Sequence, residues 1–351
     1  MNQNTLLAVD GNSLVHRAFH SMATSDLRTR DGRPLWAVKG FFSLMLGALE
    51  RTGAAAVVVG FDDSGNSSRK ASWPHYKATR KEKPEDLRQQ IVLAIELLRS
   101  AGVHVVVPAG LEADDVLASA ARTAADDGWR TVIVTSDRDS FALVDETTAV
   151  LRLINGGVDA SPLLNRERLF TLVGVHAHQY REYAAMRGDA SDNLTGISGF
   201  GAKTAAKLLA EFGTVSAAFA DVDSGGGRAA AAIGKAFAAK LARRENREEF
   251  ARCVEIMTMR TDLDLGLDLR GGGPGCLPLD ADRLGAALHS LELTSMRKLA
   301  TWLLSGSEAS TGFASVSQQL APVGRPADDY AMAATAGSPA ARPTWWQDTL
   351  F

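Results

Sequence analysis

Runs of mainly apolar residues alternate with stretches of helical period along the first half of the chain. The apolar runs have the length of strands, and they lie at Leu6–Val9, Ala54–Phe61, Val103–Val107, Thr131–Val134 and Ala149–Ile154. The stretches of helical period between them are Trp36–Arg51, Glu85–Ser100 and Leu111–Asp127. Strands without polar alternation are buried on both faces, as in a parallel sheet that helices cover on both sides. The pattern therefore predicts an α/β fold, with a mostly parallel central sheet flanked by helices.

The pattern changes after about residue 163, where helical period replaces the strand-like runs. Helices are predicted at Arg166–Val173, Gln179–Arg187, Lys203–Phe212, Ile233–Met257 and Asp282–Leu304. From Ser305 to Thr344 the chain is rich in Ala, Gly, Ser, Thr and Pro and has five charged residues, a composition with too little apolar bulk to pack. We therefore predict three parts: an α/β core at residues 1–175, a helical subdomain at residues 176–304 and a flexible tail at residues 305–351.

Composition narrows the class of protein. Hydrophobic residues make up 46% of the 351 residues, which allows a packed core in each folded part. No stretch approaches the roughly 20 apolar residues of a membrane span, and the start of the chain lacks the pattern of a signal peptide. Cys253 and Cys276 stand in no CxxC pattern, which favours free thiols over a disulfide or a zinc site. We therefore expect a cytoplasmic protein.

Carboxylates gather where the predicted strands end or a helix begins. The carboxyl ends of parallel strands share one edge of the sheet, where ligands bind in such folds. The nine acids of this pattern are Asp10, Asp62, Glu112, Asp114, Asp115, Asp137, Asp139, Asp189 and Asp192. They would repel one another unless cations balanced them, and ligands that are all oxygen favour Mg²⁺ or Mn²⁺. We predict a site for two such ions. The alternative for each acid taken singly is a helix cap or a turn residue.

A basic segment lies between residues 64 and 90. It has seven Lys and Arg residues against three acids, a local charge of +4 in a chain whose net charge is −3. Such a concentration of positive charge favours contact with the phosphates of a nucleic acid. The seven residues are Arg69, Lys70, Lys77, Arg80, Lys81, Lys83 and Arg88. The alternative is the solvated face of a basic helix.

A second candidate phosphate site is the glycine-rich sequence from Gly196 to Thr204, directly before a predicted helix. Glycines permit a tight turn whose backbone N–H groups approach a phosphate, and the helix N-terminus and Lys203 add positive charge. A plain helix cap is the alternative. The residues that we assign to DNA contact in this turn are Gly196, Ser198, Gly199, Gly201, Lys203 and Thr204.

Seven motifs occur in the order found in the 5'-3' exonuclease and flap endonuclease family, which the chain resembles from about Leu6 to Leu304. They are Val9–Asn12, Val59–Asp62, Tyr76–Arg80, Glu112–Asp115, Thr135–Asp139, Gly188–Asn193 and Gly196–Lys203. The chain is similar to the 5'-nuclease domain of bacterial DNA polymerase I, in the form of a stand-alone protein. The resemblance implies a PIN-like nuclease core, a helix-hairpin-helix subdomain and hydrolysis of DNA at 5' ends and 5' flaps.

The resemblance also implies roles for single residues. The segment at residues 64–90 would form a helical arch through which a single-stranded 5' end passes. Lys77 and Arg80 would neutralise the scissile phosphate, and Tyr76 would stack on an unpaired base. The arch residues that would contact DNA are Arg69, Lys70, Lys81 and Lys83. The glycine-rich turn would hold duplex DNA by its backbone, and the family pattern allows a potassium ion there.

The end of the chain, Trp345–Phe351, concentrates apolar residues after the predicted tail. Gln347, Leu350 and Phe351 stand as in the pentapeptide that binds the bacterial sliding clamp, which this end resembles. A short apolar peptide on a solvated tether suits docking into a groove. The alternative is a terminal segment that folds back on the nuclease.

We predict a monomeric, nucleoid-associated 5'-3' exonuclease and flap endonuclease that uses two metal ions in Okazaki-fragment processing and repair. Two alternatives from other classes stay open. One is a DNA-structure-binding protein that keeps the fold with weak catalysis or none, and the other is a phosphatase or ribonuclease with a similar acid cluster. Metal-dependent turnover separates the first, and a comparison of DNA flaps with small phosphoesters separates the second.

Overall fold

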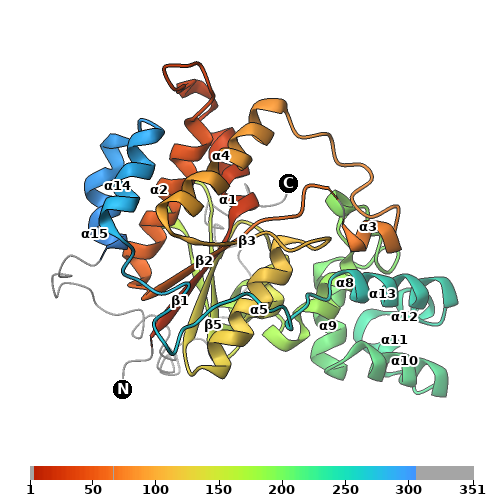
Figure 1. Ribbon diagram of the computed structural model, residues 1–351. Coiled ribbons are helices and arrows are strands. Elements are labelled where there is room, and N and C mark those ends of the chain that lie inside the picture. The colour runs from red at the N-terminus through yellow and green to blue at the C-terminus, as the bar shows by residue number, and fades with distance from the viewer. Residues whose placement is uncertain (1–3, 66, 306–351) are drawn as a thin grey trace, which may run out of the picture. The chain divides into compact units, whose positions relative to one another are not determined.

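The sheet of the computed structural model has six strands in the order β3-β2-β1-β4-β5-β6 (Figure 1). The structure describes residues 4–65 and 67–305, which lie in one compact unit. Five strands run parallel to their neighbours, and the short β6 is antiparallel to β5. The bounds are β1 Thr5–Asp10, β2 Ala56–Gly60, β3 His104–Val106, β4 Arg130–Thr135, β5 Thr148–Arg152 and β6 Leu163–Leu164. The predicted α/β fold and its five strands are confirmed, whereas β6 is too short to give a sequence pattern.

Hydrophobic clusters fill both sides of the sheet. Along β1, Leu7 and Val9 belong to one cluster and Leu6 and Ala8 to the other, because successive side chains of a strand face opposite ways. All four are fully buried, which explains the lack of polar alternation. Five helices contribute buried residues to the first cluster: α1 Gly11–Ser21, α2 Trp36–Thr52, α4 Glu85–Ala101, α14 Ala281–Ser290 and α15 Arg297–Leu304. The second receives α5 Ala113–Asp126, α7 Arg166–Val173 and α8 Tyr180–Arg187.

The helices that follow α8 share the second cluster with the sheet. They are α9 Ala202–Phe212, α10 Val215–Ser224, α11 Arg228–Ile233, α12 Lys235–Leu241 and α13 Arg244–Ile256. Leu208 of α9, Leu241 of α12 and Phe250 of α13 are buried in the same cluster as Ile133 of β4. The sheet and these helices therefore have a continuous core.

Two helices expected from the sequence are each divided in the structure. The helix predicted at Ile233–Met257 is α12 and α13, because two side chains of α13 turn back to the end of α12. Asn246 Nδ2 donates to the Lys240 carbonyl at 2.9 Å, and Arg247 Nε donates to the Leu241 carbonyl at 2.6 Å. The helix predicted at Asp282–Leu304 is α14 and α15, with a short 3-10 turn between them.

The two last helices return to the α/β core. α14 packs against α4, and α15 packs against α2 (Figure 1). The end of the range predicted for a helical subdomain, residues 176–304, therefore lies against the sheet layer. The boundary at residue 175 stays a prediction, and the tail at residues 305–351 lies outside the described residues except for Ser305.

The basic segment at residues 64–90 differs from the helical arch that the resemblance implies. Among its described residues, helix is present over α3, Ser68–Ser72, and again from Glu85 at the start of α4. Turns and extended backbone connect the two. Pro74 and Pro84 lie at the two ends of this connection, where each disfavours helical backbone at the residue before it.

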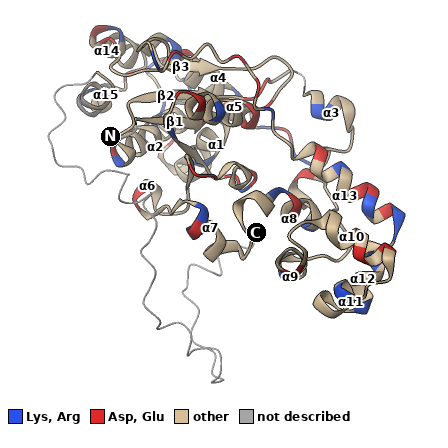
Figure 2. Cartoon of the chain, turned by 90° about the horizontal axis from the view of Figure 1, so that it is seen from below, with Lys and Arg blue, Asp and Glu red and all other residues tan. Residues whose placement is uncertain are grey.

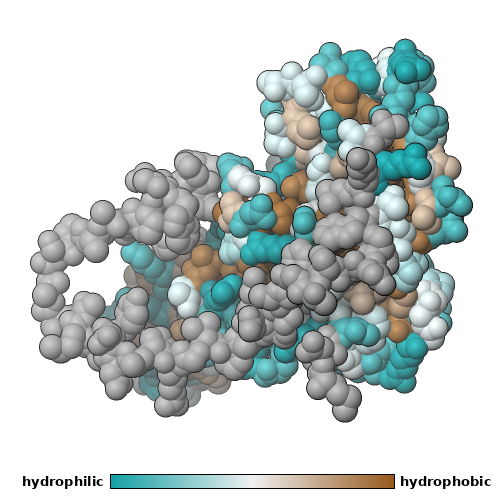
Figure 3. Space-filling model, turned by 90° about the vertical axis from the view of Figure 1, so that its left-hand side faces the viewer, coloured by the Kyte–Doolittle hydropathy of each residue, from teal (hydrophilic) through white to brown (hydrophobic). Residues whose placement is uncertain are grey.

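One face of the molecule shows how hydrophobic and hydrophilic residues are distributed at the described surface. On the face in Figure 3, hydrophobic residues form small groups among hydrophilic ones. The large hydrophobic side chains that are exposed among the described residues are Val92 and Phe170. Within the described ranges, none of the helices combines the length and apolar character needed to span a membrane.

Candidate active site

Three strands deliver carboxylates to one edge of the sheet. Asp10 is the last residue of β1, Asp62 lies two residues beyond β2, and Asp137 lies two residues beyond β4. β1 lies between β2 and β4, and all three run parallel. The acids therefore leave the sheet at its carboxyl edge, as the sequence pattern predicts.

Asp10 is buried and held from two sides. Its Oδ1 accepts a hydrogen bond from Ser13 N at 2.9 Å and so caps α1, and its Oδ2 accepts one from Thr135 Oγ1 at 2.7 Å. Burial raises the pKa of Asp10 to about 7, and repulsion from Asp62 and Asp137 adds to the effect of burial. The negative charge at this position therefore needs a compensating cation.

Asp62 is fixed by a pair of hydrogen bonds with Asn12. Asn12 Nδ2 donates to Asp62 Oδ2 at 2.8 Å, and Asp62 N donates to Asn12 Oδ1 at 3.0 Å. Ala113 N donates to Asp62 Oδ1 at 3.0 Å, which ties the end of β2 to the first turn of α5. Sequence reasoning missed Asn12 and Thr135 as supporting residues, although each stands within two residues of a predicted ligand.

Glu112 precedes α5 and is surrounded by donors from the basic segment. Its carboxylate accepts hydrogen bonds from Ser67 Oγ and Tyr76 OH, each at 3.2 Å. Lys77 Nζ lies 3.0 Å from its Oε2, and Arg69 Nη1 lies 3.2 Å from the same oxygen. Burial alone would raise the pKa of Glu112, but Lys77 and Arg69 outweigh burial and hold it below its usual value. Glu112 is therefore ionised and paired.

Asp115 forms a buried ion pair instead of facing the other acids. Arg69 donates to both of its oxygens, at 2.7 and 2.9 Å, and Arg260 N donates to Oδ1 at 2.9 Å. The Asp115 side chain has no exposure, and that of Arg69 has 12%. This geometry differs from the expected roles, in which Asp115 holds a metal ion and Arg69 contacts DNA, because each has its charge satisfied by the other.

The residues of the basic segment that we predicted to be catalytic contact acidic residues of the site. Arg80 forms an ion pair with Asp192, and Lys77 N donates to the Asp192 carbonyl at 2.9 Å. Tyr76 is 6% exposed, and the Lys77 ammonium lies 4.7 Å from the centre of its ring. Stacking of Tyr76 on an unpaired base does not fit this burial. The structure assigns the Tyr76 ring to the core and its hydroxyl to Glu112.

Asp114 and Asp139 both have pKa values raised above the usual value of a carboxyl. Burial raises the pKa of Asp139 to about 8, and Asp137, Asp189 and Asp192 add to the effect of burial. The pKa of Asp114 is also raised well above its usual value, by burial first and then by Asp137, Asp10 and Asp139. Electrostatic interactions therefore connect the acids of three elements: α5, the segment after β4 and the turn at residues 189–192. These three elements are brought together as the sequence predicts.

A small space lies among these acids. Its volume is about 10 Å³, close to that of one water-sized sphere. Its polar lining comes from Arg69, Tyr76, Glu112, Asp114, Asp139 and Asp192. As placed among the described residues, no group of three or more His, Cys, Asp or Glu side chains could hold a metal ion. Arg69, Lys77 and Arg80 take up oxygens of Glu112, Asp115 and Asp192.

The chemistry of the remaining donors fits a hard divalent cation. All are carboxylate oxygens, and neighbouring carboxylates add to the effect of burial in raising the pKa values of Asp10, Asp114 and Asp139. The acids that would hold the cation are Asp10, Asp114, Asp137 and Asp139, with Asp62 beside Asp10. Asp137 is exposed, and its Oδ1 accepts a hydrogen bond from Asp139 N at 3.0 Å.

The glycine-rich turn precedes α9, with Gly201 in the N-cap position. Gly196 is buried, and a Cβ there would lie 2.5 Å from Gly188 N. Gly196 therefore allows two backbone segments to cross, which differs from the predicted contact with DNA. Ser198, Gly199, Gly201 and Lys203 are exposed, and Thr204 is half-buried.

The other predicted arch residues lie at the surface. Lys70 and Lys81 are exposed, and Figure 2 shows basic residues gathered on α3. Lys83 is half-buried. Burial lowers its pKa, and Arg80, Lys77 and Lys70 lower it further against the attraction of Asp62. Of these three lysines, Lys83 is the one whose charge interacts with an acid of the site, Asp62.

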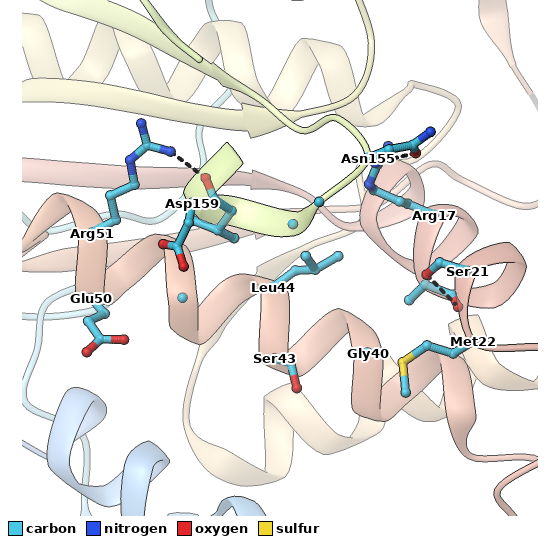
Figure 4. A pocket seen from close by; sticks show the side chains of 15 residues that line it. Arg17, Ser21, Met22, Gly40, Ser43, Leu44, Glu50, Arg51, Asn155 and Asp159 are labelled. Atoms are coloured by element: carbon cyan, nitrogen blue, oxygen red, sulfur yellow. Dashed lines mark hydrogen bonds between the residues drawn. The ribbon is translucent and has the colours of Figure 1, made fainter. Parts of the chain in front are cut away.

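A cavity of about 960 Å³ lies elsewhere, between α1, α2 and α6 Gly157–Ala160 (Figure 4). None of the nine acids lines it. Arg17 Nη2 donates to Asn155 Oδ1 at 3.1 Å at one end (Figure 4). At the other end, Arg51 Nη1 donates to the Ser161 carbonyl at 2.6 Å. The arginines that face this cavity are therefore already partnered.

Two family models match the chain. The 5'-3' exonuclease, N-terminal resolvase-like domain, matches residues 5–174, and the 5'-3' exonuclease, C-terminal SAM fold, matches residues 175–272. DNA polymerase I of Mycobacterium tuberculosis (strain H37Rv) is 34% identical over 293 residues, which are 84% of this chain and 31% of that protein. The thermostable DNA polymerase I of Thermus aquaticus is 35% identical over 291 residues, 83% of this chain and 32% of that protein. The chain thus spans about a third of the length of these relatives.

Solved structures share the fold. The T5 5'-exonuclease with divalent metal ions (zinc) bound has a TM-score of 0.56 and 20% identity, over 72% of this chain and 89% of that one. The catalytic core of Rad2 in complex with DNA substrate has a TM-score of 0.55 and 20% identity, over 86% of this chain and 92% of that one.

Proposed function

Because the chain belongs to the 5'-3' exonuclease family, we propose that it hydrolyses DNA phosphodiesters at 5' ends and at the junctions of 5' flaps. The observation that carries this proposal is the convergence of carboxylates at the carboxyl edge of the sheet, where basic side chains form ion pairs with some of them. Acids that repel one another attract cations, and the basic residues attract the phosphates of DNA. Mg²⁺ or Mn²⁺, as two ions, is the proposed cofactor.

In this proposal the carboxylates bind the metal ions, and the basic residues of the arch bind the phosphate. Bound divalent ions would activate the attacking water and stabilise the charge on the leaving oxygen. Asp10, Asp114, Asp137 and Asp139 would supply oxygen ligands, and Asp189, whose charge helps to raise the pKa of Asp139, would join them at the metal site. Lys77 and Arg80 already lie at the acidic edge, so an arriving phosphate would exchange with their carboxylate partners and gain their charge.

The two parts of the chain have separate tasks in this proposal. Residues 1–175 form the catalytic core, and residues 176–304 include the turn that holds duplex DNA. The exposed residues of this turn would approach the sugar-phosphate backbone ahead of α9; they are Ser198, Gly199, Gly201 and Lys203. A substrate that combines a duplex with a single-stranded 5' end would contact both parts.

The setting that we propose is Okazaki-fragment processing and excision repair, by a monomer in the cytoplasm near the nucleoid. The names of the curated relatives, which are DNA polymerases I, support it. Gln347, Leu350 and Phe351 lie outside the described residues, so binding of a sliding clamp rests on their sequence alone. Deletion of residues 347–351 should leave cleavage unchanged and abolish binding to purified clamp. Equal binding by both proteins would contradict this part of the proposal.

A catalytically weak DNA-structure-binding protein is the second candidate. One observation favours it: as placed, Glu112, Asp115 and Asp192 are paired with Arg and Lys, not gathered as a ligand set. In such a protein the acids would serve to anchor the arch. Substrate binding without turnover in Mg²⁺ or Mn²⁺ would identify it.

Replacement of one carboxylate tests the proposal. Asp189→Asn should reduce single-turnover cleavage of a 5'-flap DNA by roughly 100-fold or more, the size expected for an electrostatic group at a reacting centre. The affinity for DNA should persist, because the substitution removes negative charge. Asp282→Asn on α14 is a matched control, since Asp282 is exposed and remote in sequence from the site. Cleavage retained by Asp189→Asn would refute its role at the metal site.

A further inference from the structure

The ammonium of Lys240 reaches into the glycine-rich turn from a helix later in the chain. Lys240 belongs to α12, and its Nζ donates a hydrogen bond to the Ser198 carbonyl at 2.7 Å. Ser198 is exposed, whereas Lys240 is half-buried. A full positive charge thus lies at the tip of the turn, in addition to that of Lys203.

The position of Lys240 is fixed by its neighbours. Asn246 Nδ2 donates to the Lys240 carbonyl at 2.9 Å, and Asn246 is itself buried. The ammonium lies 5.1 Å from the centre of the Phe237 ring, a cation–π contact. Phe237 in turn packs edge-to-face on Phe200, which follows the turn, with ring centres 5.7 Å apart. The lysine is therefore held between an aromatic ring and a carbonyl oxygen.

The turn is shaped to accept this side chain. Gly199 has a φ of +77°, and a Cβ at this position would lie 2.6 Å from Lys240 Nζ. A side chain at residue 199 would therefore displace the ammonium or distort the turn. The glycine gives both the backbone conformation and the space for the lysine.

The carbonyls of the turn show why a cation belongs there. Phe200 N donates to the Ile197 carbonyl, and Ala205 N donates to the Gly201 carbonyl. The Ser198 carbonyl has an ammonium as its donor, although it lies at the exposed tip. A carbonyl dipole beside a phosphate would be repulsive without a cation. Glu245 and Glu249, which line the adjoining 510 Å³ depression with Ser198 and Gly199, would add to the repulsion.

We propose that Lys240 is the built-in cation of this turn, holding its shape and supplying a positive charge to a phosphate of duplex DNA. The inference rests on the proposed function, in which the turn holds DNA. One N–H of the ammonium goes to Ser198, and two others are free by valence for phosphate oxygens. A tethered ammonium takes the place of the potassium ion that the sequence resemblance allows, so binding of DNA by this protein does not depend on the monovalent cation.

Replacement of Lys240 by methionine tests the proposal. Affinity for a 5'-flap DNA in chelator would be measured from 50 to 200 mM salt, with potassium and with tetramethylammonium as the cation. Lys240→Met should bind more weakly, with a log–log salt slope smaller by about 0.9, the value for one lost phosphate contact. It should also bind more tightly in potassium than in tetramethylammonium, whereas the unaltered protein should bind equally in both.

Three comparisons make the result decisive. Lys240→Arg should retain most of the affinity, and Gly199→Ala should reproduce the loss. Lys235→Met removes an exposed charge from the same helix and should leave the affinity and the cation dependence unchanged. An unchanged salt slope in Lys240→Met, or potassium dependence in the unaltered protein, would overturn the proposal. Absence of flap binding by the unaltered protein would instead overturn the proposed function together with this inference.

Discussion

Arg69 neutralises two buried carboxylates where α5 begins. It donates to both oxygens of Asp115 and to Glu112, and also to the carbonyls of Ile256 and Thr258. The guanidinium thereby connects the basic segment, α5 and the end of α13. When a charged side chain with this many partners is removed, the main cost comes from the buried charges that are left unpaired.

Loss of Arg69 should be strongly destabilising. Arg69→Met leaves Asp115 buried without its partner, at an expected cost of about 3–5 kcal/mol in the free energy of unfolding. Arg88→Met removes a surface pair with Glu85 and should cost at most about 1 kcal/mol. Urea unfolding of both variants measures the difference. The double variant Arg69→Met/Asp115→Leu should recover part of the loss, and equal stabilities of the two single variants would contradict the buried pair.

Asp139 should destabilise the metal-free protein at high pH. Its pKa is raised to about 8, above that of an unfolded carboxyl, so the folded state binds its proton more tightly. The stability linked to that proton is complete below about pH 4 and is lost as the pH rises to about 8. In chelator, Asp139→Asn should therefore melt at least about 2 °C higher than the unaltered protein at pH 8, with no gain at pH 4.

The control for this measurement is Asp282→Asn, which removes an exposed charge. The difference in melting temperature between Asp282→Asn and the unaltered protein should be the same at pH 4 and at pH 8. A lower melting temperature of Asp139→Asn at pH 8 would mean that Asp139 is stabilised by a partner and not repelled by the other acids.

At the scale of single residues, the sequence predicts which acids lie at the edge but not how they are paired. Strand ends place Asp10, Asp62 and Asp137 together, because all parallel strands end at one edge. The pairing of Asp115 with Arg69 depends on contacts 46 positions apart, which no local pattern shows. Burial of Tyr76 is likewise a tertiary effect.

At the scale of elements, local patterns predict strands and long helices well and fail at breaks. β1, β2, β4 and β5 are largely buried on both faces, so each leaves a mainly apolar run, whereas the three residues of β3 are half-buried. The break between α12 and α13 depends on side chains of Asn246 and Arg247 that bond backwards, and helical period continues across it. The basic segment is connected to the turn at residues 189–193 by two hydrogen bonds. Asn193 Nδ2 donates to the His75 carbonyl at 2.9 Å, and Lys77 N donates to the Asp192 carbonyl.

The crossing of the two glycine segments should be sensitive to a single methyl group. Gly196→Ala would place a Cβ 2.5 Å from Gly188 N, at a φ of +61°. Gly174→Ala is a matched control, since Gly174 has a φ of +80° and open space around it. The control should cost about 1–2 kcal/mol, and Gly196→Ala should cost clearly more and weaken DNA binding. Chemical unfolding compares them, and equal costs would contradict the close approach.

At the scale of the whole molecule, the described residues share their cores across the predicted boundary. The second hydrophobic cluster joins Ile133 and Val150 of the sheet with Phe200, Leu208 and Phe250 of the helices. The first cluster takes in α14 and α15. Periodicity alone separates a strand-rich half from a helical half, but it does not show that the two halves bury the same surface.

Residues 1–175 should therefore not fold stably alone. Truncation there would expose residues of the second cluster that are buried together with α8 to α13, and would remove α14 and α15 from the first cluster. We expect loss of cooperative thermal unfolding and binding of a hydrophobic dye such as ANS. Residues 1–305 retain these elements and serve as the control. Cooperative unfolding of both fragments, at similar temperatures, would contradict a shared core.

The central claim is that the acidic edge of the sheet cuts DNA at 5' ends with the help of divalent ions. The direct test is incubation of a labelled 5'-flap DNA with the purified protein in Mg²⁺, in Mn²⁺ and in chelator, with products resolved to single nucleotides and a small phosphoester as comparison. We predict cuts at the flap junction in either metal, none in chelator, and no turnover of the phosphoester. Tight binding of the flap without cleavage in any metal, or hydrolysis of the phosphoester alone, would contradict the claim.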